Sequence, residues 1–506
     1  MRVGRYFLPV ASSVCGRGPR TSGFSANAKF ANRPIADIEN ADNRSCSCAI
    51  PGSIYSSLDA IVEFSILGAS PLGLMQMSYA RWGFAQPPFQ TTSLPATDLG
   101  ERLLVGRDKQ LASLMARIQA APKMSTVEGL NGVGKTSLVN VASYKLYKAH
   151  VETGTGPLFI PCRRIFQLDP NRSAQDFIDM VLMEVAQTLI ERSEDIKIHG
   201  DWIRTNEVDR WLNAGQLTTF QGGVLGATFG AQTATNTSSG YEQSGFRKAI
   251  TGWRETIYPD QTEGGVICTI DNLELLQTSD AVRALLEQLR DELFNMKGIR
   301  WVLCGSLGII YGVVSSPRLE GFLHKPIELE ELGDDLAAEI FASRIDAYRS
   351  GTKQPYLPLR LEDFVRLHEV LNGNLRSVLS SADEYCLEMS DDDDMPDDAA
   401  KKLAFETWLS HQAKSANDAV EKEIGRKAMS VFEQSCAHGV FSPSDHEEFG
   451  FKSIPAFRPH IKNLEAAGLL VSTQDEGDKR RKTIQVTAKG WMVKFHRQGQ
   501  ALPEGG

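Results

Sequence analysis

The spacing of apolar residues divides the chain into regions with different expected structures. Before residue 98 the apolar positions follow no sustained helical or strand period. After it, Leu111, Leu114, Met115 and Ile118 recur at helical spacing and mark one face of an amphipathic helix. Short, uninterrupted apolar runs then alternate with helical segments, a pattern typical of buried parallel strands joined by helices. An α/β domain is therefore predicted to begin at Asp98.

Several of the apolar runs are predicted strands of one parallel sheet, and a group of helices follows the last of them. The strands are expected at 124–128, 266–270, 301–305 and 326–329. Amphipathic segments follow and are predicted to form a small helical lid. These helices are expected at 334–348, 361–371 and 374–386.

The first predicted strand leads into a glycine-rich segment with a lysine, followed by a helix through Tyr147. The segment matches G-x-x-x-x-G-K-[ST] and, with the next residue, comprises Gly129, Leu130, Asn131, Gly132, Val133, Gly134, Lys135, Thr136 and Ser137. Its glycines let backbone N–H groups face phosphates, and the helix N-terminus adds favourable dipole charge. We expect Lys135 to reach the β- and γ-phosphates and the Thr136 hydroxyl to ligate Mg²⁺. The sequence thus predicts a P-loop that binds ATP with Mg²⁺.

Polar side chains at the ends of the later strands are candidates for the rest of a nucleotide site. Asp271 ends the run 266–270 and is predicted to hold Mg²⁺, while Glu274 is predicted to activate the attacking water. Ser306 is a candidate sensor of the γ-phosphate, with an ordinary turn serine as the alternative. Arg318 is a candidate to reach the site of a neighbouring subunit, although most surface arginines have no such role.

These motifs together resemble AAA+ ATPases of the origin-recognition and initiator type, over about residues 98–390. In that family a Gly-Arg segment packs beside the adenine, which here corresponds to Val105, Gly106 and Arg107. The family's lid arginine, which senses the γ-phosphate, corresponds to Arg376 in Gly-Asn-Leu-Arg. The resemblance implies a P-loop ATPase sheet with a helical lid.

One segment departs from the family pattern. About 135 residues separate Lys135 from Asp271, which implies an insertion around 195–250 and puts the strand order and any hexamer geometry in doubt. The insertion is rich in Gly and Thr from Gln221 to Ser244. Its stretch 222–230 is interpreted as a loop without fixed structure, with a hairpin that touches a partner or nucleic acid as the alternative.

A second domain is predicted after an acidic run at 391–398, which reads as a solvated linker. From Glu421 the expected order is helix, short helix, helix, strand, polar tip, strand and helix. This order resembles a winged helix-turn-helix domain, and the segment 486–490 is similar to the end of the wing in MarR-type regulators.

Basic residues gather on the predicted wing tip and recognition helix, as expected for contacts with DNA phosphates. They are Lys479, Arg480, Arg481 and Lys482 on the tip, and Arg458, His460 and Lys462 on the helix. Pro455 and Pro459 disfavour a regular recognition helix, and winged helices also serve as protein-contact modules. DNA contact, mainly to the backbone, is preferred over protein packing.

The amino-acid composition predicts a cellular compartment for the protein but excludes few functions. The net charge of −9 argues against a protein coated in nucleic acid, yet a local basic patch is compatible with it. The eight cysteines show no paired spacing and are interpreted as reduced thiols of a cytoplasmic protein. The apolar stretch 61–77 is interrupted by Glu63 and Pro71 and is too short for a membrane span.

Residues 1–97 are expected to lie outside the folded part. The first 75 or so are rich in Ser, Ala, Gly, Asn and Arg, with no acidic residue before Asp37. They fit a disordered tail, a transit peptide, or a stretch upstream of the true start at Met75 or Met77. The last interpretation is preferred.

The expected domain order is an ATPase core at 98–332, a lid at 333–390, a linker and helix at 391–420 and a winged helix at 421–500.

The leading hypothesis is an AAA+-type ATPase, slow or partner-stimulated, that acts on DNA or a DNA-bound assembly. Self-association and a partner protein are left open. The alternative is a STAND-like signalling NTPase whose winged helix contacts protein. That class carries a Gly-x-Pro lid element and carboxy-terminal repeats, which this sequence lacks.

Overall fold

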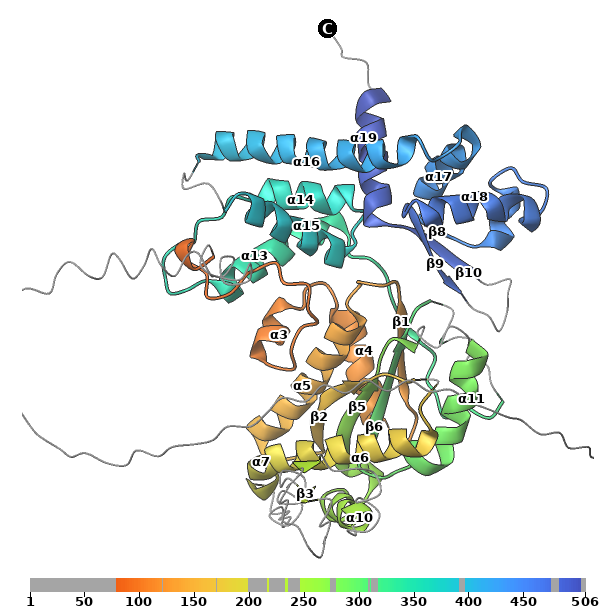
Figure 1. Cartoon of the computed structure of the whole chain (residues 1–506). Coiled ribbons are helices and arrows are strands. Elements are labelled where there is room, and N and C mark those ends of the chain that lie inside the picture. Colours follow the sequence, from red (N-terminus) through yellow and green to blue (C-terminus); the bar gives the residue numbers. More distant parts are fainter. Residues whose placement is uncertain are drawn as a thin grey trace, which may run out of the picture. The chain divides into compact units, whose positions relative to one another are not determined.

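The computed structural model describes the chain from residue 79 onward, with several internal gaps (Figure 1). The described residues are 79–120, 122–169, 171–198, 216–217, 233–234, 246–273, 279–307, 310, 317–390, 396–474 and 482–501. In these ranges no helix combines the length and the apolar character that a membrane crossing requires.

A five-stranded sheet forms the centre of the first domain. Its strands are β1 (Ser125–Gly129), β2 (Leu158–Phe166), β5 (Gly264–Ile270), β6 (Ile299–Gly305) and β7 (Ile327–Leu329). They lie in the order β2-β5-β6-β1-β7, and every neighbouring pair is parallel. β5 and β6 are buried along their whole length, which explains their uninterrupted apolar sequence. The predicted α/β parallel sheet is confirmed.

The sequence pattern did not predict β2, because Pro161, Arg163 and Arg164 interrupt its apolar run. The strand lies at an edge of the sheet, and its register with β5 shifts between Pro161 and Ile165. An edge position tolerates both a proline and exposed charges, since one side of the strand needs no partner.

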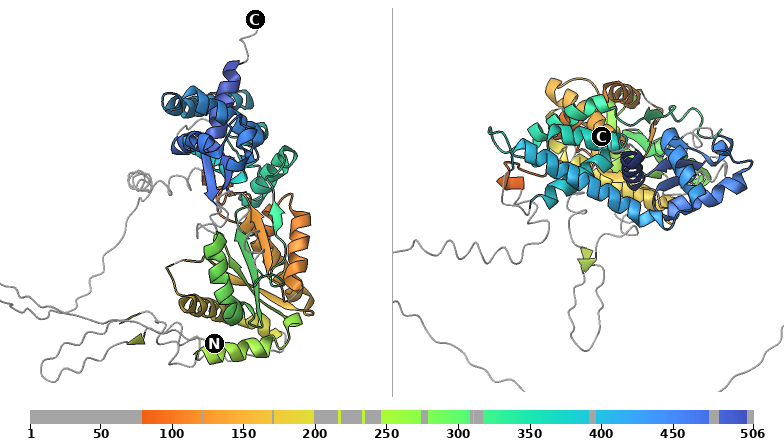
Figure 2. Two further views of the ribbon diagram at one scale, coloured as in Figure 1. Left: turned by 90° about the vertical axis from the view of Figure 1, so that its right-hand side faces the viewer. Right: turned by 90° about the horizontal axis from the view of Figure 1, so that it is seen from above.

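Helices cover both faces of the sheet (Figure 2). Ile267 and Val302 pack in one core with α4 (Asp108–Gln119) and α5 (Lys135–Thr153), whereas Cys268 and Leu303 belong to a second core. This alternation follows from the two-residue period of a strand. The second core includes α6 (Ala174–Glu191), α7 (Ser193–Ile198), α10 (Phe246–Ile257), α11 (Ser279–Leu289) and the π-helical turn η3 (Arg290–Phe294).

Residues 79–97 belong to the folded core, although the sequence pattern assigned them to an N-terminal extension. Tyr79, Trp82, Phe84 and Phe89 are buried. Phe89 stacks on Phe364 of the lid with ring centroids 5.7 Å apart. The segment was missed because its aromatic residues follow neither a helical nor a strand period, so only the tertiary packing reveals them.

The lid consists of helices close to the predicted positions. They are η4 (Asp334–Leu336), α13 (Ala337–Tyr348), α14 (Leu361–Val370) and α15 (Leu375–Glu388). The short helix α3 (Asp98–Leu103) packs against α13 and thereby links the lid to the sheet domain.

Helix α16 (Asp398–Glu421) joins the lid to the second domain by direct packing. Its Phe405, Trp408 and Leu409 are buried, and Trp408 lies 5.2 Å from the ring of Tyr385 in α15. The helix also packs along α19 (Ala488–Ala501), which it crosses in Figure 1. One continuous apolar core therefore runs from the lid into the second domain.

The second domain has the predicted winged-helix order. Its elements are α17 (Arg426–His438), β8 (Val440–Phe441), η5 (Pro443–Glu447), α18 (Ile454–Ala466), β9 (Leu470–Gln474), β10 (Lys482–Val486) and α19. The three strands form an antiparallel sheet in the order β8-β10-β9. Phe457 of α18 is fully buried and packs within 5 Å of the rings of Phe449 and Phe451.

The described residues of the insertion add no strand to the parallel sheet, in which β2 pairs directly with β5. Within it the structure describes an antiparallel pair, β3 (Gln216–Leu217) with β4 (Thr233–Ala234). The segment 222–230, where a loop or a hairpin was expected, lies outside the described residues. A 3-10 turn, η1 (Gln261–Glu263), leads from α10 into β5.

Replacement of Phe89 by Ala tests whether residues 79–97 belong to the fold. Removal of a fully buried aromatic ring leaves a cavity and should lower the free energy of unfolding by about 3–5 kcal/mol, measured by urea denaturation. Leu403→Ala is the control, because Leu403 is 67% exposed and its loss should change that free energy by less than about 0.5 kcal/mol. Equal midpoints for both variants would contradict the packing of this segment.

Candidate nucleotide-binding site

The bend between β1 and α5 is shaped by two glycines with left-handed backbone. Gly132 has φ 90° and Gly134 has φ 95°, a region in which residues with a side chain are strained. A Cβ at Gly132 would lie 3.0 Å from Cβ of Arg376, so this glycine also allows a close approach of the lid. The bend delivers the chain directly into the N-terminus of α5, whose dipole favours an anion.

Lys135 is buried at the start of α5, and its ammonium group lies against the bend. Nζ donates to the carbonyl oxygens of Gly129 at 3.0 Å and Leu130 at 3.1 Å. These two bonds place a full positive charge beside the glycine-rich backbone. Gly129 and Leu130 thus orient the lysine, and neither residue lines the cavity between the bend and the lid that is described below.

The hydroxyl of Thr136 and the carboxylate of Asp271 meet although they come from different elements. Thr136 Oγ1 donates to Asp271 Oδ2 at 2.5 Å, and the backbone N–H of Asn272 donates to Asp271 Oδ1 at 2.9 Å. Among the described residues no group of three or more His, Cys, Asp or Glu side chains could hold a metal. One carboxylate and one hydroxyl fit Mg²⁺, which completes its six oxygen ligands with waters and substrate phosphates.

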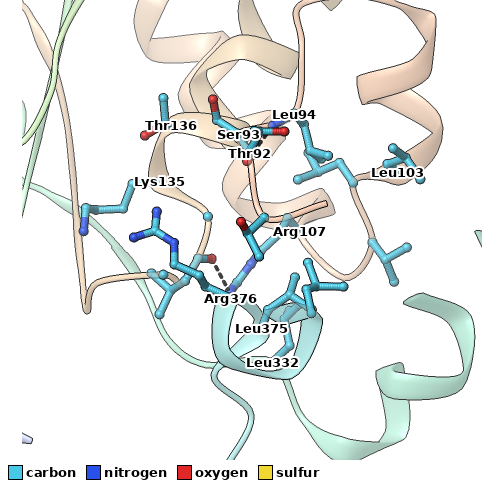
Figure 3. A pocket seen from close by; sticks show the side chains of 18 of the residues that line it. Thr92, Ser93, Leu94, Leu103, Arg107, Lys135, Thr136, Leu332, Leu375 and Arg376 are labelled. Carbon is cyan, nitrogen blue, oxygen red and sulfur yellow. Dashed lines mark hydrogen bonds between the residues drawn. The ribbon is translucent and has the colours of Figure 1, made fainter. Parts of the chain in front are cut away.

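A cavity, called the main cavity below, lies between the bend, the sheet domain and the lid. Lys135, Arg107 and Arg376 line it from three separate elements, and Figure 3 shows their side chains. Its apolar walls come from the sheet domain and from the lid. They include Leu103, Val105, Leu332, Ile340, Leu375 and Leu379. An apolar chamber with cationic and N–H groups at one end suits a ligand with an aromatic base and phosphates.

The Gly-Arg segment borders the main cavity, and its packing beside an adenine stays a prediction. Val105 lines the cavity, while Gly106 has φ 72° and would bring a Cβ within 2.4 Å of Leu336 in the lid. Arg107 Nη2 donates to Val133 O at 3.2 Å and Glu330 O at 2.6 Å, which ties the bend to the end of β7. Burial lowers the pKa of this guanidinium.

One wall of the cavity was not anticipated, because it comes from the segment before Asp98. Thr91, Thr92, Ser93 and Leu94 line it. Leu94 N donates to Ser137 Oγ at 3.0 Å, and Asn140 Nδ2 donates to Leu94 O at 2.8 Å. This wall is therefore attached to the first turns of α5 by hydrogen bonds.

Arg344 holds the same segment from the lid side and was also missed. It is 4% exposed, and Nη1 donates to Pro88 O at 2.9 Å and Gln90 O at 3.3 Å. Burial lowers the pKa of Arg344 to about 10, so it stays charged at neutral pH. The sequence did contain one signal for this role, because Arg344 lies on the apolar face of the predicted helix 334–348.

The candidate sensors occupy different places. Arg376 lines the main cavity from the first turn of α15. Ser306 is buried, and its Oγ lies 3.5 Å from Oδ1 of Asn131 in the bend. Both Ser306 and Asn131 border a small cavity that Thr483 and Gln485 of the winged helix close. Ser306 therefore approaches the bend from outside the main cavity.

A second cavity is called the interdomain cavity below. It is lined by the bend, the lid and the winged helix, including Asn131, Asn374, Arg376, Thr487 and Trp491. Arg376 lines both this cavity and the main one. The side chain thus lies between the proposed nucleotide and the winged helix.

Two predicted catalytic residues are not among the described residues that line the main cavity. Glu274 falls outside the described residues, so its role stays a prediction. Arg318 is 64% exposed, pairs with Glu287 at 3.4 Å and does not line the main cavity. Its position on the surface leaves its proposed reach toward another subunit as a prediction.

The predicted DNA-contact residues are described only in part. Arg458 and Lys462 are exposed one turn apart on α18, which continues through Pro459 and carries Pro455 in its first turn. His460 is half-buried, and burial and then Lys427 lower its pKa. Lys479, Arg480 and Arg481 lie outside the described residues, as does the side chain of Lys482.

Among known proteins, only solved structures are found to be similar to this chain. No protein-family model and no curated protein matches the chain. The chain is similar to the solved structure of the Aeropyrum pernix ORC1 protein in complex with DNA, at 12% identity and TM-score 0.39, with 83% of this chain and 99% of that one covered. The Aeropyrum pernix ORC2 protein, in ADPNP–ADP complexes, matches at 11% identity and TM-score 0.40, with coverage of 83% and 99%. CDC6P from Pyrobaculum aerophilum matches at 12% and 0.34, with coverage of 82% and 99%.

Replacement of Arg344 by Met tests the unanticipated wall. Two buried carbonyls lose their charged donor, which should lower the free energy of unfolding by about 2–3 kcal/mol and weaken ATP binding several-fold. Calorimetric titration and urea denaturation measure the two effects. Arg102→Met is the control, since Arg102 is 53% exposed in a surface pair with Asp346, and such a pair contributes less than about 1 kcal/mol. Unchanged ATP affinity in Arg344→Met would show that the wall is not part of the site.

Proposed function

We propose that this protein is an ATP-binding and ATP-hydrolysing switch that acts on DNA, or on a DNA-bound assembly, through its winged helix. One observation carries the proposal: Lys135 and Thr136 of α5, Asp271 after β5 and Arg376 of α15 line one cavity. Two cations, a hydroxyl and a carboxylate beside a helix N-terminus are the groups that a nucleoside triphosphate with Mg²⁺ requires.

In the proposed complex the phosphates lie along the glycine-rich bend. Backbone N–H groups of the bend bind the α- and β-phosphates, and the Lys135 ammonium exchanges its two carbonyl partners for phosphate oxygens. The base lies among Val105, Leu332 and Ile340, where the apolar walls exclude water. Since no polar contact to a base edge supports a particular nucleobase, the choice of ATP follows from the family resemblance.

Hydrolysis requires a metal and a base. Thr136 and Asp271 would hold Mg²⁺, which when bound neutralises charge that develops on the phosphates. Glu274 would orient and deprotonate the attacking water, and Arg376 and Ser306 would respond to the γ-phosphate. Arg318 would act on the site of another copy. We expect slow or partner-stimulated turnover, since Arg318 does not line the main cavity of its own chain.

DNA contact is proposed through the outer face of α18 and the basic wing. Arg458 and Lys462 are exposed on this face, and neither has an acidic partner described within hydrogen-bond reach. Charges of this kind favour contact with phosphates over recognition of bases.

A signalling switch is the second candidate, and one observation favours it. Thr483 and Gln485 of the winged helix border the same small cavity as Asn131 of the bend and Ser306. A winged helix that covers the nucleotide site can act inside the protein instead of on DNA.

Nucleotide binding is tested with Lys135→Ala and Arg376→Ala. Loss of Lys135 should abolish binding of both ADP and ATP, whereas loss of Arg376 should weaken ATP about tenfold and ADP much less, because the arginine contacts the γ-phosphate. Titration with fluorescent nucleotide analogues in Mg²⁺ measures both. Lys145→Ala, on the same helix and paired with Glu101, should bind like wild type. ATP binding by Lys135→Ala with wild-type affinity would exclude this site.

DNA binding is tested with the double variant Arg458→Ala and Lys462→Ala. It should weaken binding to duplexes of different sequence alike and reduce the slope of log K against log salt by about two, as two phosphate contacts are lost. Fluorescence anisotropy with ADP and with an ATP analogue measures this. Lys402→Ala, 60% exposed on α16, is the control. Absence of wild-type DNA affinity with either nucleotide would reject the DNA role and favour the signalling switch.

A further inference from the structure

One side chain of the lid is hydrogen-bonded to the backbone of the phosphate-binding bend. Asn374 Nδ2 donates to the carbonyl oxygen of Asn131 at 3.1 Å. Its Oδ1 accepts from the backbone N–H of Ser377 at 3.1 Å and from the Ser377 hydroxyl at 3.0 Å. Asn374 is the N-cap of α15, so the amide that caps the lid helix also holds the bend.

The orientation of this amide follows from its partners. A backbone N–H only donates and a carbonyl oxygen only accepts, so Oδ1 must face Ser377 and Nδ2 must face Asn131. A flipped amide would lose both bonds at once.

The bond to the Asn131 carbonyl also determines where the next N–H points. In a trans peptide the carbonyl of residue 131 and the N–H of Gly132 point in opposite directions. Asn374 borders the interdomain cavity and not the main one, whereas Gly132 borders the main cavity and not the interdomain one. With the carbonyl held toward Asn374, the Gly132 N–H is directed into the proposed nucleotide site.

The position of Asn374 is itself restricted by its turn. Asn372 and Gly373 have φ values of 52° and 73°, and a Cβ at Gly373 would lie 2.8 Å from the carbonyl oxygen of Leu332. Asn372 Nδ2 donates to Glu331 Oε2 at 3.1 Å. The turn therefore presents Asn374 to the bend in one conformation.

We propose that Asn374 is a positioning residue that aims the Gly132 N–H at the nucleotide phosphates. This inference rests on the proposed nucleotide binding. Because the same amide caps α15, the phosphate-binding geometry is intact only while the lid is closed on the bend. Movement of the lid releases the Asn131 carbonyl and weakens the grip on the α- and β-phosphates, which ADP and ATP share.

Asn374→Ser separates the two roles of the side chain. Serine is an equally good N-cap and carries no charge, but its hydroxyl is too short to reach Asn131 while it accepts from Ser377. Loss of one hydrogen bond should weaken ADP and ATP binding alike, by about threefold to tenfold, in titrations of the full chain with fluorescent nucleotides and Mg²⁺. The urea midpoint should stay at the wild-type value.

Two further variants make the comparison complete. Asn374→Ala loses both the N-cap of α15 and the hydrogen bond to the Asn131 carbonyl. It should therefore match Asn374→Ser in nucleotide affinity but unfold at a lower urea concentration. Ser173→Ala removes the cap of α6, where Ser173 Oγ accepts from Asp176 N at 3.1 Å, and should lower the urea midpoint without a change in affinity.

The outcomes distinguish this inference from the function on which it rests. Wild-type affinity for both nucleotides in Asn374→Ser would reduce Asn374 to a helix cap and overturn the proposal. A loss confined to ATP would also overturn it, since the effect would then act through Arg376. If the wild-type chain bound neither nucleotide, the proposed function itself would fail.

Discussion

The hydrogen bond between Thr136 and Asp271 is the contact on which the rest of the site depends. It joins the start of α5 to the end of β5, two strands away from β1 in the sheet. A hydroxyl and a carboxylate at 2.5 Å bring together the two oxygen ligands that Mg²⁺ would share. The parallel sheet makes the contact available, because it gathers the carboxyl ends of its strands at one edge.

The bend at Asn131 is the meeting point of three regions that are far apart in sequence. Asn374 of the lid binds its carbonyl, Ser306 lies beside its amide, and Gln485 of the winged helix borders the same small cavity. The winged helix is also anchored to the lid through the buried face of α16. In the proposed mechanism, a ligand that changes the bend therefore acts on the lid and the winged helix together.

Much of this arrangement could be predicted from local sequence, and the exceptions have physical causes. The P-loop, Asp271 and the winged helix depend on short motifs and regular periods, which a linear pattern reveals. Leu94 and Arg344 depend on contacts between distant segments; no period marks Leu94, and the signal for Arg344 was a charge on the apolar face of a predicted helix. Asn374 lay inside a recognised Gly-Asn-Leu-Arg motif, yet its bond to Asn131 spans 243 positions and required the fold.

The central claim is that the nucleotide site, the lid and the winged helix respond as one unit. Hydrogen–deuterium exchange of the full chain, with and without ADP and Mg²⁺, measures this directly in peptides that cover 129–137, 372–377 and 482–487. The account predicts that the nucleotide slows amide exchange in all three. Protection of 129–137 alone, with unchanged exchange in the lid turn and the wing strand, would contradict it.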